Sequence, residues 1–358
     1  MLSRPAALRN TVLTAIDKLG RRSRTLSRPL KIHLEVNDVC NLKCIHCPRE
    51  DPTIPKNTGH MKMEVIEALR PSFRTAAYVG LIGNGEPFMH PRLLDIVDIV
   101  AAEGAVPSII SNATLWTDAK LDRLIAAGKS IMNISFDGGT KETFEWVRRP
   151  AVFEDVVANM RRLRARREAA KSPFPVTAMI SCLFKEALHE APKVVEIAAG
   201  CGVQMIHFQC AIPYAQAFQA SVFTPEDRPR VEEALALARA RGAELGVRVH
   251  FHSQWDGERP RLNGGGVLCP NIMEQLHIDM HGRPRFCCYW GPEDLGNVVD
   301  TPVKTLWNQP KFQELRGRFK RGDVPGLCLS MPCPNLRPHS PREILGEAWR
   351  LAKEFLRD

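Results

Sequence analysis

The stretch that decides the fold is Cys40-Asn41-Leu42-Lys43-Cys44-Ile45-His46-Cys47, which follows a strand-like run at 31–37. Three thiols on one short loop are typical of a metal cluster. A tetrahedral zinc site needs a fourth protein ligand, whereas three thiolates can hold an iron–sulfur cube with one iron left open. The C-x3-C-x2-C spacing differs from the C-x2-C pairs of zinc fingers and from four-cysteine ferredoxin runs, so it favours the open-iron cluster. A zinc-binding or simply buried cysteine cluster is the alternative.

The length and composition are those of an ordinary globular protein. The chain has 358 residues, 44% hydrophobic and 25% charged, enough for one barrel-sized domain and a smaller appendage. No apolar run approaches the ~20 residues that span a bilayer. Eleven cysteines without a secretory signal predict a cytoplasmic location and metal ligation, not a disulfide framework.

The net charge of +9 is concentrated at the N-terminus. Residues 1–31 contain eight Lys and Arg residues and a single acid, Asp17, so the rest of the chain is nearly neutral. This start superficially resembles a transit peptide or a basic arm, but a solvated N-terminal helix within 1–30 is the favoured interpretation. No later segment interleaves basic and aromatic residues as a nucleic-acid groove would, so no nucleic-acid partner is predicted.

From residue 31 onward, short β-branched runs alternate with amphipathic segments of helix length, which predicts an α/β fold built from repeated βα units. The predicted strands are 31–37, 76–82, 106–111, 130–136, 175–183 and 203–208. The predicted helices are 62–70, 92–104, 118–127, 152–168, 188–200 and 226–243. Six units are too few to close an eight-stranded barrel, so we expect an open, partial (β/α)6 barrel over 31–255.

Polar side chains share one face of three predicted strands. They are His33, Glu35 and Asn37 on the first, Asn133, Ser135 and Asp137 on the fourth, and His207 and Gln209 on the sixth. Unpaired polar groups are costly to bury, so these faces predict a hydrated or ligand-filled lumen. Mutually satisfied hydrogen bonds inside an ordinary core are the alternative.

The second predicted strand ends in Gly83-Asn84-Gly85-Glu86-Pro87. Its glycines allow a ligand to approach the backbone, and Pro87 stiffens the exit. Together with the cysteine loop, this segment resembles the Gly-Glu-Pro segment of the radical S-adenosylmethionine (SAM) superfamily, which binds the SAM amino group. The resemblance implies a 4Fe-4S cluster on Cys40, Cys44 and Cys47, whose open iron chelates SAM. One electron then cleaves SAM, and the resulting 5′-deoxyadenosyl radical abstracts a substrate hydrogen.

The same resemblance implies further SAM contacts where other strands end. The family places ribose and carboxylate contacts at positions matching Ser111, Asn112, Ser135 and Asp137. His46 departs from the more usual aromatic residue, although its neighbourhood still offers backbone to adenine. An external one-electron reductant such as flavodoxin or ferredoxin is implied as a partner.

After a Gly-, Pro- and Arg-rich linker at 256–267, two short runs flank His281-Gly282-Arg283 and predict a hairpin. The Cys269-x12-Gly282-x4-Cys287 spacing is similar to the opening of SPASM and twitch domains, the auxiliary-cluster extensions of radical SAM enzymes. With Cys328 and Cys333, it implies a second 4Fe-4S cluster in a domain over 256–338, best matched by the one-cluster twitch form. A structural zinc site is the alternative. Residues 339–358 are expected to form a C-terminal helix.

The substrate is less determined, and we expect oxidation of a small molecule of the sugar or aminocyclitol type. The alternatives are an epimerase of a similar substrate, a peptide- or protein-modifying enzyme, and a non-catalytic iron–sulfur or zinc protein. An epimerase needs a hydrogen donor, most simply a thiol in the lumen. The alternating pattern predicts that Cys182 and Cys210 face the helices and not the lumen. Cys288 is therefore the first candidate hydrogen donor, and Cys210 is the second. Because these strand thiols are predicted to point away from the lumen, we expect oxidation and not epimerisation.

Overall fold

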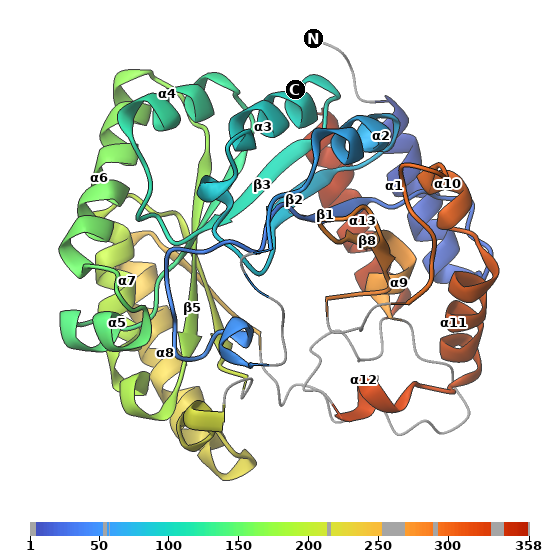
Figure 1. Cartoon of the computed structure of the whole chain (residues 1–358). Coiled ribbons are helices and arrows are strands. Elements are labelled where there is room, and N and C mark those ends of the chain that lie inside the picture. Colours follow the sequence, from blue (N-terminus) through green and yellow to red (C-terminus); the bar gives the residue numbers. More distant parts are fainter. Residues whose placement is uncertain are drawn as a thin grey trace.

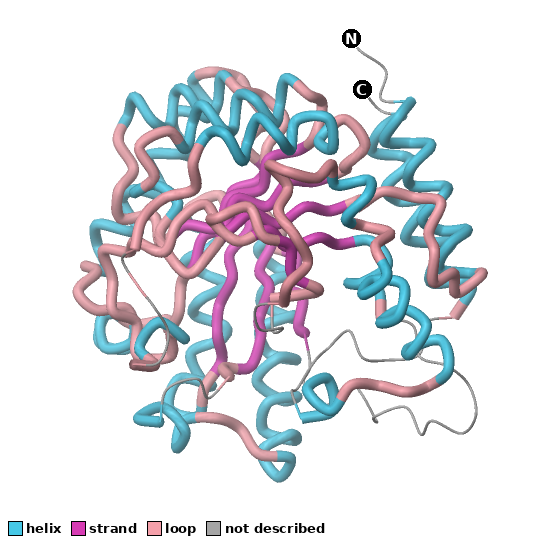
Figure 2. Tube along the Cα trace, turned by 45° about the vertical axis from the view of Figure 1, so that its right-hand side comes forward, coloured by secondary structure: helices cyan, strands magenta, loops and turns pink. Residues whose placement is uncertain are grey.

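The computed structural model describes residues 5–52, 56, 58–212, 216–252, 269–288, 293–330 and 340–356. The predicted linker at 256–267 and the predicted ligand Cys333 lie outside these residues. A single twisted sheet runs through the centre, and helices lie around the outside of its strands (Figure 1, Figure 2). None of the helices in the described ranges combines the length and apolar character needed to cross a membrane.

The strands are β1 (Lys31–Glu35), β2 (Tyr78–Ile82), β3 (Val106–Ser111), β4 (Ile131–Ser135), β5 (Val176–Leu183), β6 (Met205–Cys210), β7 (Arg248–His252), β8 (Gln275–Ile278) and β9 (Pro284–Arg285). The helices of the barrel are α2 (Met63–Phe73), α3 (Leu93–Ala102), α4 (Asp118–Ala126), α5 (Lys141–Val147), α6 (Phe153–Ala169), α7 (Ala191–Gly200) and α8 (Arg228–Leu245). The remaining helices are α1 (Pro5–Leu19), α9 (Pro270–Glu274), α10 (Val303–Leu306), α11 (Pro310–Arg321), α12 (Gly326–Ser330) and α13 (Pro341–Leu356).

The strand order is β7-β6-β5-β4-β3-β2-β1-β8-β9. Neighbours from β7 to β8 are parallel, and β9 returns antiparallel to β8. The α/β partial barrel and the C-terminal hairpin predicted from the sequence are therefore confirmed. The hairpin turns at Gly282, where φ is +85° and an added Cβ would lie 2.6 Å from Asn297 Oδ1.

Two elements of the barrel were not predicted. The elements predicted from the sequence end with the helix that forms α8 and do not include β7, a five-residue strand that lies just before the Gly- and Pro-rich segment. They also do not include α5, which has only seven residues and follows directly on the Gly138-Gly139 turn. Both are too short to show a clear hydrophobic period, and neighbouring elements hold them in place.

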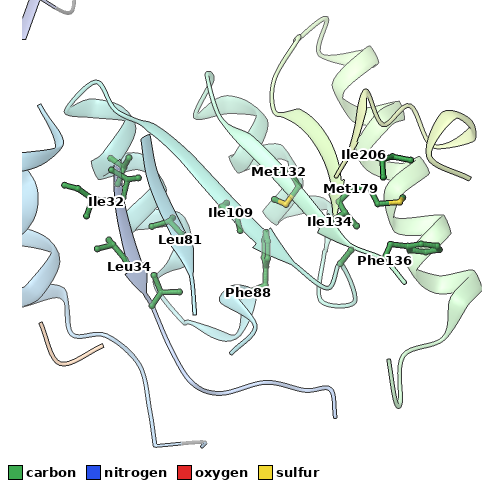
Figure 3. Packing of buried hydrophobic residues seen from close by; sticks show 14 of the residues in the cluster. Ile32, Leu34, Leu81, Phe88, Ile109, Met132, Ile134, Phe136, Met179 and Ile206 are labelled. Carbon is green, nitrogen blue, oxygen red and sulfur yellow. The ribbon is translucent and has the colours of Figure 1, made fainter. Parts of the chain in front are cut away.

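The main core lies between the sheet and the barrel helices. In β1 the fully buried side chains Ile32 and Leu34 alternate with partly exposed ones. The same outer face continues through Leu81, Ile109 and Met132 (Figure 3). Each such side chain contributes about 1.5–3 kcal/mol to stability when it is buried. The other face of the same strands is left to line the lumen.

Two terminal helices pack together beside β1 and β8. α1 contacts α13, and its inner face is buried, so the predicted N-terminal helix is present but only its outer face is solvated. Lys31 Nζ on β1 lies 2.7 Å from Glu274 Oε1, and Lys18 Nζ on α1 lies 3.0 Å from Glu347 Oε2 on α13. Lys18 also pairs with Glu274. This network ties both ends of the chain to the sheet.

Candidate active site

The cysteine loop lies at the carboxyl end of β1 and is fixed by the last residue of α5 and the segment that follows it. The Lys43 amide donates to the Arg149 carbonyl at 2.6 Å, and the Ile45 amide donates to the Val147 carbonyl at 3.0 Å. The Cys47 amide donates to the Cys44 carbonyl at 3.0 Å, which closes a turn between the second and third thiols. The loop conformation is thus set by backbone hydrogen bonds on both sides of Cys44.

The three loop thiols are partly buried, and that burial opposes their ionisation. It raises the pKa of the Cys44 thiol to about 12 and also raises the pKa values of Cys40 and Cys47. Thiolates in such a place need a strong positive partner, and iron is one. Three thiols on one loop therefore fit the donor set of a cluster with one open iron, as the spacing predicts.

The glycine segment after β2 packs directly against the start of the cysteine loop. An added Cβ on Gly85 would lie 2.7 Å from the Val39 amide nitrogen, so no other residue fits without movement. The Glu86 amide donates to the Val39 carbonyl at 2.8 Å, and Asn37 Nδ2 donates to the Glu86 carbonyl at 2.9 Å. Gly83, Asn84 and Gly85 stay partly open to solvent, so their backbone remains accessible to a ligand.

Glu86, by contrast, turns its carboxylate into the protein. The side chain is 2% exposed and accepts hydrogen bonds from Ser111 Oγ at 2.7 Å and from the Asn112 amide at 2.7 Å. It also accepts from the Phe88 amide, which caps the 3-10 turn opened by Pro87. Burial raises the pKa of Glu86 against these hydrogen bonds. Glu86 and Ser111 thus tie the ends of β2 and β3 together, and a direct SAM contact by either side chain stays a prediction.

Asn112, the next predicted residue, reaches the cysteine loop. Its Nδ2 donates to Asn41 Oδ1 at 3.0 Å, and Asn41 Nδ2 donates to Thr114 Oγ1 at 2.8 Å. Asn41 lies between the first two cysteines, so the end of β3 helps to position the cysteine loop.

Asp137, just after β4, is fully buried in an ion pair with Arg148. The Arg148 Nη2 and Asp137 Oδ2 atoms are 2.6 Å apart, and the Cys182 amide donates to Asp137 Oδ1 at 2.6 Å. His46 Nε2 lies 3.5 Å from the same carboxylate; burial lowers the pKa of His46 although Asp137 opposes the shift. Burial also opposes the charge of Arg148, but Asp137 and Cys44 keep its pKa above the ordinary value.

Arg148 is the site residue that the sequence reasoning missed. It belongs to no recognisable motif, and only the fold brings it beside Asp137 and Cys44. Its backbone lies between the two carbonyl groups that hold the cysteine loop. A buried guanidinium here both pairs with Asp137 and places positive charge beside the Cys44 thiol.

The lumen is polar, and one predicted orientation in it is wrong. Strand register aligns Ser135 with Ile180 and His207, and aligns Cys182 with Gln209, so Cys182 points into the lumen. Gln209 Nε2 donates to Cys182 Sγ at 3.4 Å. The prediction is wrong because it places the more polar residues of β5, Thr177, Met179 and Ser181, in the lumen. Thr177 in fact faces outward. Its hydroxyl is satisfied there by the Gly202 carbonyl at 3.2 Å.

The two predicted thiol donors lie elsewhere. Cys210 shares the outer face of β6 with Ile206 and Phe208, as its alternation predicts, and burial raises the pKa of its thiol to about 12. Cys288 is exposed just after the hairpin. The thiol that the structure brings to the lumen is therefore that of Cys182.

Strands β1, β8 and β9 form a second polar wall. The His33 and His277 rings stack with centroids 4.7 Å apart, and burial lowers their pKa values to about 4 and 3, so both are neutral at pH 7. Arg285 Nη1 lies 3.2 Å from Glu35 Oε1. Among the described residues, His33 Nδ1, His277 Nε2 and Arg285 Nε have no hydrogen-bond partner.

The candidate auxiliary ligands occupy the C-terminal extension. Cys269 precedes α9, Cys287 follows β9, and Cys328 lies in α12, all three partly buried. Cys269 lines a small cavity with Arg21 and Arg316. Cys333, the predicted fourth ligand, lies outside the described residues, so this ligand set stays a prediction.

The fold and site together define a class: a parallel, partial α/β barrel with a three-thiol loop at the carboxyl ends of its strands and a cysteine-containing extension. Residues 34–198 match the family model described as the radical SAM superfamily, and residues 269–334 match the SPASM iron–sulfur cluster-binding domain. The chain belongs to the radical SAM superfamily and carries a C-terminal SPASM domain. Its cofactors are a core 4Fe-4S cluster, an auxiliary cluster and SAM.

Several curated relatives align over most of their own length. The AdoMet-dependent heme synthase of Methanosarcina barkeri is 24% identical over 330 residues, which is 84% of this chain and 88% of the relative. The GTP 3′,8-cyclase of Listeria welshimeri is 28% identical over 292 residues, 77% of this chain and 84% of the relative. Among solved structures, SAM-bound SuiB of Streptococcus suis superposes with a TM-score of 0.68 at 11% identity, covering 91% of this chain and 80% of SuiB.

Proposed function

We propose that this enzyme oxidises a hydroxyl-bearing small molecule of the sugar or aminocyclitol type. When bound, the core cluster on Cys40, Cys44 and Cys47 and SAM supply the radical that removes a hydrogen atom from the substrate. Converting a carbinol to a carbonyl requires the loss of one hydrogen atom, one proton and one electron. The auxiliary cluster would supply an acceptor for the electron, and we assign it to Cys269, Cys287, Cys328 and Cys333.

The polar lumen is the observation that carries this proposal. On one side, Asn133 Nδ2 donates to Ser108 Oγ at 3.0 Å, and His207 stacks on His250 with ring centroids 5.3 Å apart. On the other side stand His33 and His277, with polar atoms that lack partners within the described residues. Neutral imidazoles can donate and accept hydrogen bonds, and so can hydroxyl groups, so such walls suit a polyhydroxylated ligand.

The relatives support a small substrate. The heme synthase and the GTP cyclase, which align with this chain over most of their own length, are both named for small molecules. SuiB has also been solved with its precursor peptide SuiA, but at 11% identity that likeness concerns the fold alone and does not favour a peptide here. Peptide modification remains an alternative hypothesis.

Because Cys182 points into the lumen, the orientation of the thiols does not exclude epimerisation. The position of Cys182 relative to the cysteine loop bears on whether the enzyme oxidises or epimerises its substrate. The Cys182 side chain lies close to the cysteine loop. Its sulfur, a ring nitrogen of His46 in that loop and a carboxylate oxygen of Asp137 all lie within 4.8 Å of one another. An epimerase must return hydrogen to the face of the substrate opposite to the one from which it was removed. Because Cys182 lies beside the cysteine loop, we infer that its thiol would share the side of removal, and this supports oxidation.

Turnover in deuterated water tests the proposal, with a panel of sugars and aminocyclitols screened for stimulated 5′-deoxyadenosine formation. We expect a product oxidised by two electrons and formed in equal amount to 5′-deoxyadenosine. Cys182→Ser should retain this product. A product of unchanged oxidation level that carries one solvent deuterium, and that disappears in Cys182→Ser, would establish epimerisation instead.

A further inference from the structure

The outward face of α1 is apolar. Val12, Ile16 and Leu19 recur at helical spacing, and their side chains are 51%, 45% and 42% exposed. Arg9 is the only charged side chain that is exposed on this helix. A helix on the surface of a globular protein normally turns its polar side to the solvent. In α1 the polar side is turned inward, and the apolar side is left without a partner in the described part of the chain.

Buried hydrogen bonds and ion pairs fix the orientation of α1. Asn10 Nδ2 donates to the Thr75 carbonyl at 2.9 Å, and Asp17 Oδ2 accepts from the Ser27 amide at 2.8 Å. Lys18 is buried in its ion pairs with the sheet and with α13. Turning the helix to hide its apolar side would break these contacts and expose or strand their polar atoms, which is costly. The exposure of the apolar side is therefore a stable property of the fold.

The adjoining helix α13 adds a second exposed apolar pair. Leu345 and Trp349, one turn apart, are 54% and 59% exposed, and Lys353 Nζ lies 5.2 Å from the centre of the Trp349 ring. α1 and α13 contact each other and lie side by side in Figure 1. Of the twelve large hydrophobic side chains exposed within the described residues, six belong to these two helices and to Leu26, which follows α1. Such gathering marks an interaction surface, which we call the α1–α13 face.

The charged side chains of this face are almost all cations. Of the acids in 5–28 and 341–353, Asp17 is buried, Glu347 is paired with Lys18, and only Glu343 at the start of α13 is exposed. The exposed cations without an ion pair in the described ranges are Arg9, Arg21, Arg24, Arg342, Arg350 and Lys353. The α1–α13 face is therefore positively charged, which is complementary to an anionic surface.

The composition of the face favours a lipid surface over a protein or a nucleic acid. In a symmetric dimer the same patch meets itself, so these cations would face one another. Binding of nucleic acid uses aromatic side chains for stacking, whereas the apolar residues here are aliphatic except for Trp349. Aliphatic side chains with a Trp, bordered by Lys and Arg, are typical of helices that lie in the interface of an anionic membrane.

We propose that the α1–α13 face binds the surface of an anionic membrane, with its helices lying on the bilayer and not crossing it. The cations contact the anionic headgroups, and the apolar side chains enter the boundary between the headgroups and the acyl chains. Each cation near such a surface strengthens binding about fivefold. The enzyme would thus be held at the membrane reversibly. The inference is independent of the proposed oxidation of a hydroxyl-bearing substrate.

Sedimentation with lipid vesicles tests the proposal and needs no substrate. The reconstituted, full-length enzyme is mixed anaerobically with vesicles of phosphatidylcholine, alone or mixed with phosphatidylglycerol, and the bound fraction is measured after centrifugation. At low salt the mixed vesicles should bind at least ~10-fold more tightly, and this advantage should shrink as salt is raised. Ile16→Glu/Trp349→Glu should weaken binding to mixed vesicles by at least ~10-fold, because it removes two apolar contacts and adds two negative charges.

The matched control is Leu237→Glu/Leu245→Glu, which places two acids at exposed apolar positions of α8 and should bind vesicles as the wild type does. If Ile16→Glu/Trp349→Glu retains less iron than the wild type, Arg9→Gln/Arg24→Gln replaces it, with the same expected loss of at least ~10-fold.

Three results would overturn the proposal. The first is a wild-type enzyme that does not bind mixed vesicles, or that binds both kinds of vesicle equally. The second is an equal loss of binding in the α8 control. The third is a dimer that Ile16→Glu/Trp349→Glu dissociates, without any binding to vesicles, which would assign the face to a second copy of this chain.

Discussion

At the residue scale, the site depends on groups that position the cysteine loop and are not among the predicted cluster ligands. Asp137 and Arg148 form a fully buried ion pair, and Arg148 lies next to the backbone carbonyls that hold the loop. Removing one partner of a buried pair is far more damaging than removing both, because the remaining charge is left without compensation.

This asymmetry gives the first prediction. Arg148→Met should destabilise the protein by about 3–5 kcal/mol and lower its iron content, because Asp137 keeps a buried, unpaired charge. The double variant Asp137→Asn/Arg148→Met should recover part of the lost stability. Urea unfolding and iron analysis measure both effects. Equal stability of the single variant and wild type would show that the pair does not hold the loop.

The second prediction concerns Gly85. Gly85→Ala should destabilise the fold by about 1–3 kcal/mol and reduce the iron retained, because the new methyl group would overlap the Val39 backbone. Gly346→Ala is the control, since Gly346 lies in α13 with no atom within 4 Å of an added Cβ; it should be neutral or stabilising by up to ~1 kcal/mol. Melting temperatures compare the two. Similar losses in both variants would contradict the packing argument.

The sequence was informative about residues whose chemistry is local. The three cysteines and the Gly-Glu-Pro segment are visible because their meaning lies in short spacings. Arg148 and the orientation of Cys182 are set by contacts between distant segments, such as those with Asp137 and Gln209. No short window of sequence contains that information.

At the element scale, α13 is joined to the sheet by charge. Burial opposes ionisation of Glu347, yet Lys18 and Lys31 lower its pKa to about 2 from an ordinary 4.5. A carboxylate with a depressed pKa stabilises the fold above its unfolded pKa. That contribution is lost as the pH falls from about 4.5 towards 2.

The third prediction follows from this sign. Glu347→Gln should cost on the order of 1–2 kcal/mol at pH 7, a value reduced for screening because the side chain is 34% exposed. The difference from wild type should diminish as the pH is lowered through 4.5 towards 2. Urea unfolding of the two proteins in the same metal state, at matched pH values, measures it. A difference that persists unchanged at low pH would exclude the charge as its source.

Predicted elements were reliable where the hydrophobic pattern was long, as in α6 and β5. They failed at α5 and β7, whose seven and five residues give no clear period. The pairing of β8 with β1 was also invisible, because these strands are more than 200 residues apart in sequence.

At the scale of the whole molecule, the cluster assignments predict metal content. Anaerobically reconstituted protein should hold about eight irons, if each of two clusters holds four. Replacing Cys40, Cys44 and Cys47 together with Ala should remove about four irons and all SAM cleavage, whereas Cys269→Ala should lower iron content and spare the core cluster. Iron, zinc and 5′-deoxyadenosine analyses measure this. One zinc and about four irons in the wild type would identify the extension as a structural zinc site.

The pairing of β8 with β1 has a consequence for how the two domains can be separated. β8 and β9 extend the barrel sheet beyond β1, so residues of the extension satisfy the backbone hydrogen bonds along that side of β1. Cutting the chain after β7 would leave β1 as an open edge, and unprotected edges recruit other chains. We therefore expect that the barrel does not stay soluble without the extension. Truncation or exchange of the extension should cause the protein to aggregate through the exposed edge of β1, and not produce a smaller active enzyme.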